Sequence, residues 1–336
     1  MNNVGLALQV SLISQRNLVI QTTDYDDAVD LIRTAAHVNY DINDIVEVDL
    51  LALDAQFDGI TDCMVKEDGS LYNFVILKNL ECVHLDFEKK GSLLRVLNQL
   101  SRFDKVASRN MENEPLKFGK HIVYKPSLFA LIPVIRNGNK MPAINPQIKS
   151  RFFFSQLYIP VANDTYNHQC TVDDILQARR RLSTVFVKAT VEEYAHSLFV
   201  FTRSHRLCSL APLTARPPLS ARENVMVLAK ALTFVKDTPQ DGPLFVTPAL
   251  IKVAFRKVAY WLVDWETNPL FNGEGESDDY RKKMEISMLT GDWFGSEWRY
   301  VENYLAKNTQ TTDAHSTTGF TNPLVEDVLT SVQPPI

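Results

Sequence analysis

Residues Asn17–Thr23 read NLVIQTT, a run of apolar and β-branched side chains that predicts a short buried strand. The turn that follows contains three acidic residues, Asp24, Asp26 and Asp27, and leads into a predicted helix over Ala28–Val38. Asp24 suits the N-cap position, and carboxylates in a first helical turn interact favourably with the helix dipole. The order strand, turn, helix is the first sign of an α/β fold.

Three further strands are predicted downstream, at Ile45–Leu53, Leu71–Leu77 and Leu128–Ile135, with a helix at Gly91–Ser101 between the last two. The segment Leu71–Leu77 reads LYNFVIL, and its continuous apolar centre is typical of a strand buried on both faces. Strands that alternate with helices indicate a parallel sheet with crossover helices.

The second half of the chain has helical spacing from about Thr171 onward. The predicted helices are Val172–Thr184, Val191–Arg206, Ala221–Val235, Thr247–Val263 and a closing helix at Val325–Val332. Thr247-Pro248 is a favourable helix start, with a capping hydroxyl followed by proline. On the second helix, Tyr194, Leu198 and Phe201 recur at helical intervals and predict one buried face.

Composition restricts the class of protein. The 336 residues are 45% hydrophobic and 22% charged with a net charge of −5, which is ordinary for a globular chain and argues against direct nucleic-acid binding over the whole surface. The four cysteines form no CxxC pair, as expected for reduced thiols in the cytoplasm or nucleus. No basic segment precedes Val4–Ile13, and the longest apolar run, Leu128–Ile135, is too short to span a bilayer, so we expect an intracellular protein without a membrane span.

Three motifs of the second half resemble the helical lid of AAA+ proteins of the MoxR type. They are Val191–Leu198 followed by Thr202–Arg206, the segment Ser220-Ala221-Arg222 in the place of the second sensor, and Leu244–Pro248 at a helix start. This resemblance implies an AAA+-like, P-loop NTPase-type parallel-sheet core followed by a helical lid.

Within that superfamily, the chain resembles the fungal maintenance of telomere capping protein 2 family. The residues that carry this resemblance are Lys125–Phe129, Asn145–Phe154, Tyr194–Arg206, Asn322-Pro323-Leu324, Val328-Leu329 and Pro334-Pro335. The match runs from about Leu12 to the end of the chain and is loose before Tyr72. It implies a noncatalytic AAA-like protein implicated in telomere capping, with no settled biochemical activity.

The residues that a working P-loop ATPase needs are absent from the predicted positions. A P-loop uses glycines to wrap the phosphates, a lysine for the terminal phosphates and a Ser or Thr for Mg²⁺. Thr23–Asp27 contains neither glycine nor lysine, and its three carboxylates would repel phosphate. After Phe74–Leu77 the chain has Lys78-Asn79 where an acidic pair would hold the metal. The only Gly-Lys, Gly119-Lys120, is interpreted as a turn. ATP hydrolysis is therefore not expected, while nucleotide binding in an altered pocket stays open.

Two arginines occupy the places of residues that sense nucleotide in AAA+ proteins. Arg151 sits at the position of the arginine finger and Arg222 at that of the second sensor. The alternative is that both are ordinary arginines at helix ends, which we favour, since a protein without phosphate ligands has nothing for them to sense. We regard them as candidate vestigial residues.

Two further groups of residues, the Cys/His pairs and a cluster of arginines, each have both a functional and a structural interpretation. The pairs Cys82/His84 and His168/Cys170 could supply four zinc ligands if both lay on strands, but the spacing matches no known zinc signature and unrelated half-buried side chains are favoured. A basic cluster could meet nucleic-acid phosphates or an acidic partner, or could be a solvated helix face balanced by Asp173, Asp174, Glu192 and Glu193. Its members are Arg179, Arg180, Arg181, Arg203 and Arg206.

All four tryptophans lie in the last quarter of the chain, at Trp261, Trp265, Trp293 and Trp298. Aromatic side chains are frequent at interface hot spots, so Trp265, Trp293 and Trp298 are candidate interface residues. The alternative, held as equally good, is that they fill a second small core against the lid.

These observations predict three regions: an AAA+-like α/β core over residues 1–165, a helical lid over 166–265 and a C-terminal extension over 266–336. The predicted function is that of a nonenzymatic scaffold or adaptor with protein partners, no catalytic residues, no cofactor and no metal. The alternative function is a diverged nucleotide-binding protein or weak ATPase.

Overall fold

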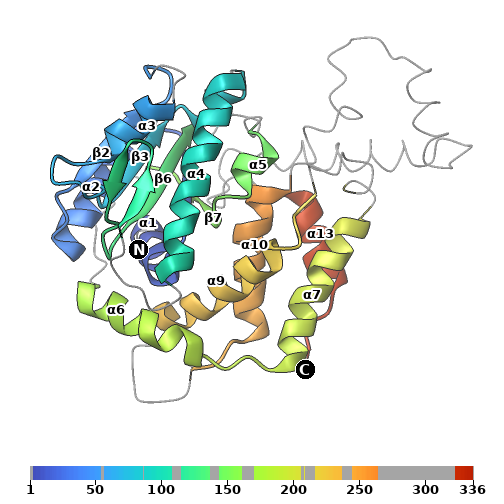
Figure 1. Ribbon diagram of the computed structural model, residues 1–336. Helices are drawn as coiled ribbons and strands as arrows, with labels where there is room; N and C mark the ends of the chain where they lie inside the picture. Colours follow the sequence, from blue (N-terminus) through green and yellow to red (C-terminus); the bar gives the residue numbers. More distant parts are fainter. Residues whose placement is uncertain are drawn as a thin grey trace, which may run out of the picture.

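The computed structural model describes residues 3–53, 57–85, 87–107, 115–136, 144–160, 170–205, 208, 216–236, 244–263 and 322–335. In this part of the chain a parallel β-sheet lies between two layers of helices, and a group of helices from the second half packs beside it (Figure 1). None of the described helices combines the length and the apolar character needed to cross a lipid bilayer.

The central sheet has five strands, all parallel to their neighbours, in the order β2-β3-β6-β1-β7. Their bounds are β1 Leu18–Thr22, β2 Ile45–Asp49, β3 Phe74–Lys78, β6 Ala130–Arg136 and β7 Phe154–Tyr158. The first strand of the chain therefore lies between the fourth and the fifth of the sheet. The α/β fold class predicted from the sequence is confirmed.

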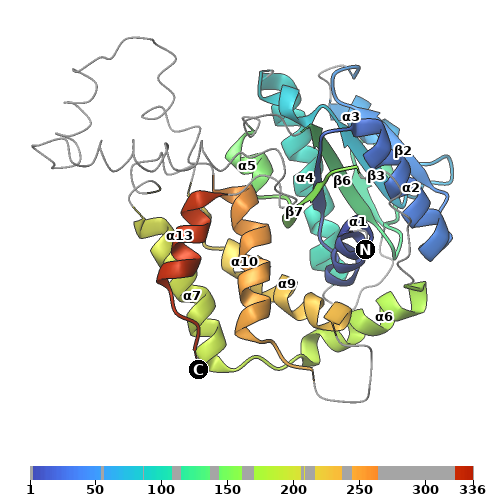
Figure 2. The ribbon, with the colours of Figure 1, turned by 180° about the vertical axis from the view of Figure 1, so that it is seen from behind.

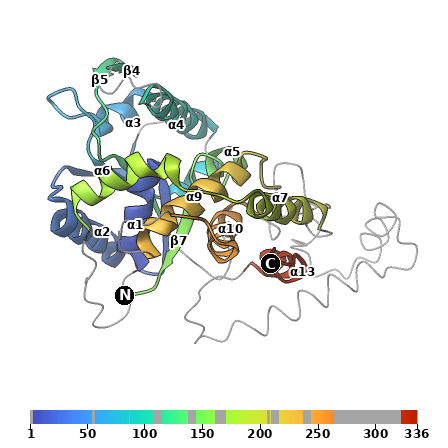
Figure 3. The same ribbon diagram turned by 90° about the horizontal axis from the view of Figure 1, so that it is seen from below.

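The helices and the hairpin of the first half have the bounds α1 Asn3–Ser14, α2 Tyr25–Tyr40, α3 Phe57–Met64, the 3-10 helix η1 Leu80–Leu85, α4 Phe87–Ala107, β4 Leu116–Phe118, β5 His121–Val123 and α5 Pro146–Lys149. Helix α4 lies in front of the sheet in Figure 1, and α1 and α2 lie in front of it in Figure 2, which is seen from behind. From below, α3 and α4 lie on one side of the molecule, apart from α1 and α2 (Figure 3). Gly119, at the turn between β4 and β5, has φ +62°, and a Cβ there would lie 2.6 Å from Thr61 Oγ1. The interpretation of Gly119-Lys120 as a turn is confirmed.

The helices of the second half are α6 Val172–Arg181, η2 Leu182–Thr184, α7 Ala189–Ser204, α9 Ala221–Lys236, α10 Pro248–Leu262 and α13 Pro323–Ser331. Thr247 caps α10 by accepting a hydrogen bond from the Leu250 N–H, with Pro248 in the first turn as predicted. The closing helix α13 lies against α7 and α10 (Figure 2).

One predicted helix face is wrong in part. Tyr194 and Leu198 of α7 are buried, but Phe201 is 49% exposed. The buried stripe of α7 also includes Ala195 and Thr202. With 3.6 residues per turn, Phe201 lies at the edge of that stripe, outside the contact with the neighbouring helices.

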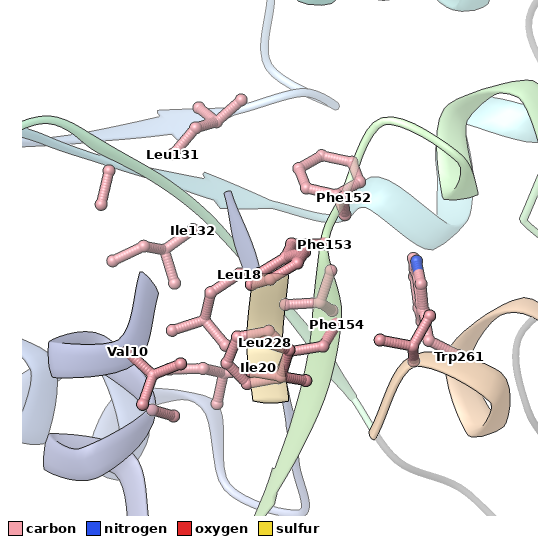
Figure 4. Packing of buried hydrophobic residues seen from close by; sticks show 14 of the residues in the cluster. Val10, Leu18, Ile20, Leu131, Ile132, Phe152, Phe153, Phe154, Leu228 and Trp261 are labelled. Atoms are coloured by element: carbon pink, nitrogen blue, oxygen red, sulfur yellow. The ribbon is translucent and has the colours of Figure 1, made fainter. Parts of the chain in front are cut away.

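Aromatic side chains join the sheet to the helical half. Phe152 and Phe153 precede β7 and Phe154 is its first residue, and all three are buried. Phe152 packs edge-on against Trp261 of α10, with ring centroids 6.4 Å apart. Figure 4 shows these rings with Leu228 of α9 beside the β1 residues. The sheet and the helical half therefore share one continuous core.

Candidate functional site

The candidate site lies where β1, β2 and β3 end. In open parallel sheets, ligands bind outside the carboxyl ends of the strands, beside the loops that lead into the helices. Six polar residues from this region interact with one another here, and we call them the strand-end network. They are Tyr25 and Arg33 of α2, Glu47 and Asp49 of β2, Lys78 of β3 and Asn79.

The turn between β1 and α2 is closed on itself. The Asp24 carboxylate accepts hydrogen bonds from the backbone N–H groups of Asp26, at 3.1 Å, and Asp27, at 3.3 Å. Thr22 Oγ1 accepts from the Asp24 N–H at 3.1 Å and donates to the Asp24 carbonyl at 2.7 Å. Free N–H groups at a helix start are what a phosphate would bind. In this protein a carboxylate of the chain already holds two of them.

The end of β3 carries an ion pair. Lys78 Nζ lies 2.5 Å from Glu47 Oε2 on the neighbouring strand, and Arg33 of α2 pairs with the other oxygen of the same carboxylate. The Lys78 and Glu47 side chains are 28% and 20% exposed, so this pair is only partly screened by water. Lys78, which stands where a working ATPase would have a metal-binding acid, is thus held in an ion pair with Glu47.

Tyr25 closes the network from the side of α2. Lys78 Nζ lies 4.7 Å from the centre of its ring, a cation–π distance. Its hydroxyl oxygen is buried and has no hydrogen-bond partner among the described residues. Burial, followed by the negative charge of Glu47, raises the pKa of the Tyr25 hydroxyl far above its ordinary value, so the phenol is neutral.

The carboxylate of Asp49 is held by donors rather than by a cation. Asn79 Nδ2 donates to its Oδ1 at 2.7 Å, and the Leu51 N–H donates to the same oxygen at 2.9 Å. The hydrogen bond from Asn79, with that from Leu51, lowers the pKa of Asp49, so the side chain stays ionised. Asn79 has φ +59°, a left-handed conformation that asparagine tolerates better than most residues.

The candidate sensing arginines lie outside this network. Arg151 follows α5 and Arg222 lies in the first turn of α9, and both are exposed. None of the hydrogen bonds and ion pairs of the strand-end network involves either of them. Glu223, next to Arg222, lies 4.0 Å from Arg16, which precedes β1, whereas Asp24 follows that strand. The structure therefore does not join these arginines to the strand ends.

Three polar side chains fix the helical half to the core, and we call them the lid anchors. Arg179 of α6 donates from Nε to the Leu12 carbonyl at 2.8 Å and from one terminal nitrogen to the Ser127 carbonyl at 2.6 Å. Trp261 Nε1 donates to the Lys149 carbonyl at 2.8 Å. Lys257 of α10 donates to the side-chain carbonyl of Gln156 on β7.

Burial lowers the pKa of the two basic lid anchors, Arg179 and Lys257. It lowers the pKa of the Arg179 guanidinium to about 10 and that of the Lys257 ammonium to about 8. The predicted basic cluster is thus corrected at Arg179, which is engaged with backbone carbonyls. Arg203 is also engaged, with the Pro217 carbonyl at 2.9 Å, and Arg206 lies outside the described residues.

The structure describes only part of the zinc arrangement that was considered from the sequence. Cys82 and His84 lie on η1, so the strand that this pair required is not present there. Cys170 is buried at the start of α6, and His168 lies outside the described residues. Within the described ranges there is no group of three or more His, Cys, Asp or Glu residues that could hold a metal ion.

Of the four tryptophans, the structure describes Trp261 alone, and it is fully buried in the shared core. The candidate interface residues Trp265, Trp293 and Trp298 lie outside the described residues. Their role stays a prediction.

Most of the strand-end network escaped the sequence analysis. Its signal was present in IVEVD at Ile45–Asp49, where Glu47 and Asp49 alternate with apolar residues. Alternation places both acids on one face of β2. With Lys78 predicted at the end of the next strand, a charged pair could have been anticipated there.

Comparisons with known proteins add little to this picture. No protein-family model matches the chain, and no curated protein sequence matches it. Among solved structures it is similar to a protein from Cytophaga hutchinsonii named a "putative ATPase", with 13% identity, a TM-score of 0.49, and coverage of 78% of this chain and 81% of that one. The α/β fold class depends on the strand order and strand pairing and not on this likeness.

Proposed function

We propose that this protein is a nonenzymatic AAA-like scaffold or adaptor whose former nucleotide site is filled by its own side chains. The observation that carries the proposal is the cap of α2, where the Asp24 carboxylate accepts from the Asp26 and Asp27 N–H groups. A phosphate that displaced it would leave that carboxylate beside a polyanion. Like charges about 4 Å apart repel by roughly several kcal/mol near a protein surface, so the exchange is unfavourable.

Local charge supports the same conclusion. In the strand-end network, the positive charges of Arg33 and Lys78 are matched by the negative charges of Glu47 and Asp49, and Asp24 adds a further negative charge nearby. The region therefore offers no surplus positive field to attract a triphosphate. Lys78 at the end of β3 cannot ligate Mg²⁺, so hydrolysis lacks its metal as well as its phosphate ligands.

The lid anchors favour a fixed structure over a motor. Arg179, Lys257 and Trp261 each form a directional bond from a lid helix to the core. Lid movement in either direction would break these bonds and leave partly buried donors unsatisfied, at about 1–3 kcal/mol each. A lid held in this way suits a protein that presents surfaces to partners.

The biological setting follows from the family resemblance alone. The segments that resemble the telomere-capping family, among them Asn145–Phe154 and Tyr194–Arg206, support a scaffold in a complex linked to telomere maintenance. A scaffold without phosphate ligands is not expected to form a nucleotide-dependent hexamer. It would act as a monomer, a small oligomer or a subunit of a mixed complex.

A thermal-shift titration with Mg²⁺-ATP and Mg²⁺-ADP tests the proposal against its alternative, a diverged nucleotide-binding protein or weak ATPase. A ligand at ~100 times its dissociation constant stabilises the native state by about 2.7 kcal/mol, which a melting curve detects readily. We expect no shift and no ATP turnover above background. A turnover rate that Arg222→Ala abolishes would overturn the scaffold proposal and restore Arg222 as a sensor.

A further inference from the structure

Two phenylalanines stand side by side on the surface of the helical half. Phe186 follows η2 and Phe245 precedes α10, and their segments form an isolated parallel β-bridge. The Phe186 N–H donates to the Leu244 carbonyl at 3.0 Å, and the Val246 N–H donates to the Phe186 carbonyl at 3.0 Å. The rings are 64% and 59% exposed. In Figure 1 the connection from α6 to α7 passes the segment that leads into α10 at this point.

The exposure of these rings follows from the backbone. In extended segments, successive side chains point in opposite directions. Val185 and Val246, each 4% exposed, point into the core, so their neighbours Phe186 and Phe245 point outward. The bridge and the two buried valines hold both rings in place without burying them.

The segments that carry the two rings are basic in sequence. Arg180 and Arg181 end α6, Lys188 precedes α7, and Lys252 lies in the second turn of α10. The sequence contains no acidic residue between Asp174 and Glu192 or from residue 244 to 263. Among the described residues, none of these four cations has an acidic partner in an ion pair. The two rings and the four cations are called the Phe186–Phe245 surface.

We propose that the Phe186–Phe245 surface binds an acidic segment of a partner protein that also carries apolar side chains. Exposed aromatic rings provide a large contact area at low cost in conformational entropy. The unpaired cations select a partner of negative charge and steer its approach. The inference rests on the proposed scaffold function, for which it names the contact surface and the chemistry of the partner.

A nucleic acid is a poorer fit for the same surface. Its affinity comes from many phosphate contacts along a continuous basic groove, and its long-range field extends over the whole protein. This chain has a net charge of −5, which opposes a long polyanion. A short acidic segment, in contrast, meets only the local cations.

The test is fluorescence anisotropy with a labelled synthetic peptide that repeats Glu-Glu-Leu-Phe, using the full chain. We expect binding that weakens with added salt and that falls about tenfold or more in the double variant Phe186→Ser, Phe245→Ser. The charge variant Arg180→Glu, Arg181→Glu should weaken binding similarly. The matched control is Phe87→Ser, because Phe87 is 83% exposed at the start of α4, away from this surface. That control should bind as the wild type does.

Two results would overturn the inference. One is an unchanged affinity in both surface variants, or no binding of the peptide at all. The other is that oligothymidylate of the same length binds through Phe186 and Phe245 more tightly than the peptide, which would make the surface a nucleic-acid site. Circular dichroism of each variant shows that it is folded. Loss of this inference leaves the scaffold proposal standing on other surfaces, whereas nucleotide binding or turnover would remove the scaffold proposal itself.

Discussion

Replacement of Tyr25 by phenylalanine should stabilise the protein. The Tyr25 hydroxyl oxygen is buried without a hydrogen-bond partner among the described residues, and the ring alone makes the 4.7 Å contact with Lys78. In the unfolded chain that hydroxyl bonds to water, and its unsatisfied burial costs about 1–3 kcal/mol. Since Tyr25→Phe removes the hydroxyl and keeps the ring, the free energy of unfolding should rise by about 1 kcal/mol. For a chain of this size the melting temperature should rise by about 2 °C.

The same substitution has a signature at high pH. The pKa of the Tyr25 hydroxyl is raised in the folded state above the ordinary value of 10.0. Above that pH the unfolded chain releases a proton that the folded chain retains, so wild-type stability falls as pH rises. The Tyr25→Phe variant lacks this loss, and its advantage over the wild type should therefore widen above about pH 10.

Urea unfolding at neutral and alkaline pH measures both effects. Tyr260→Phe is the matched control, because the Tyr260 hydroxyl donates to Glu326 at 2.5 Å. Removing that charge-assisted hydrogen bond should lower the free energy of unfolding by about 1.5 kcal/mol. A similar decrease in the free energy of unfolding for Tyr25→Phe would mean that the Tyr25 hydroxyl has a hydrogen-bond partner in the folded protein. That result would refute the conclusion that this hydroxyl is buried without a partner.

Three further predictions concern the helical half. Burial alone would raise the pKa of the Glu326 carboxyl, but its hydrogen bonds with Arg256 and Tyr260 outweigh burial and lower the pKa. The free energy of unfolding should therefore fall as the pH drops below about 4.5. In urea unfolding experiments, Glu326→Gln should make this decline smaller. Arg179→Leu should reduce the free energy of unfolding by about 2 kcal/mol by stripping two carbonyls of their donor, while Arg180→Leu, at an exposed position, should change it by less than about 0.5 kcal/mol. Leu198→Asp should abolish the cooperative thermal transition because it places an unpaired charge at a position with 0% exposure, and a wild-type melting temperature would contradict this.

The parts of the fold predictable from sequence were those with a clear period or a clear cap. The Asp24 cap, the Thr247-Pro248 start and the apolar runs of β1, β3 and β6 all follow from local chemistry. The helix α1 was missed, because Val4–Ile13 is buried almost all round and so shows no polar face. The strand β7 was missed as well, since Phe152 and Phe153 precede it without alternation.

For the candidate site, the sequence predicted which residues are missing but not which contacts form. The lack of glycine and lysine at Thr23–Asp27 can be seen from the sequence alone, because it depends only on residue identity. What occupies the place instead depends on the pairing of β2 with β3, which sets Asp49 opposite Lys78 and brings Glu47 within reach of the lysine. Parallel register is a tertiary property that one sequence does not encode locally. The lid anchors are hidden for the same reason, because Arg179 meets Leu12, 167 positions away.

The lid anchors and the Phe186–Phe245 surface are connected through α10. This helix carries two of the anchors, Lys257 and Trp261, and Phe245 lies three residues before its start. A helix pinned to β7 and α5 at its centre and end holds its first turn in a fixed position relative to α6, which Arg179 pins to the core. The two segments that present the rings are therefore ordered before any partner arrives. Preordered contact residues lose less entropy on binding than mobile ones do, and a greater share of their contact energy becomes affinity. If the protein is a scaffold as proposed, its helical half can thus act as a rigid platform. A substitution that removes the Arg179 hydrogen bonds to Leu12 and Ser127 should then weaken peptide binding at Phe186.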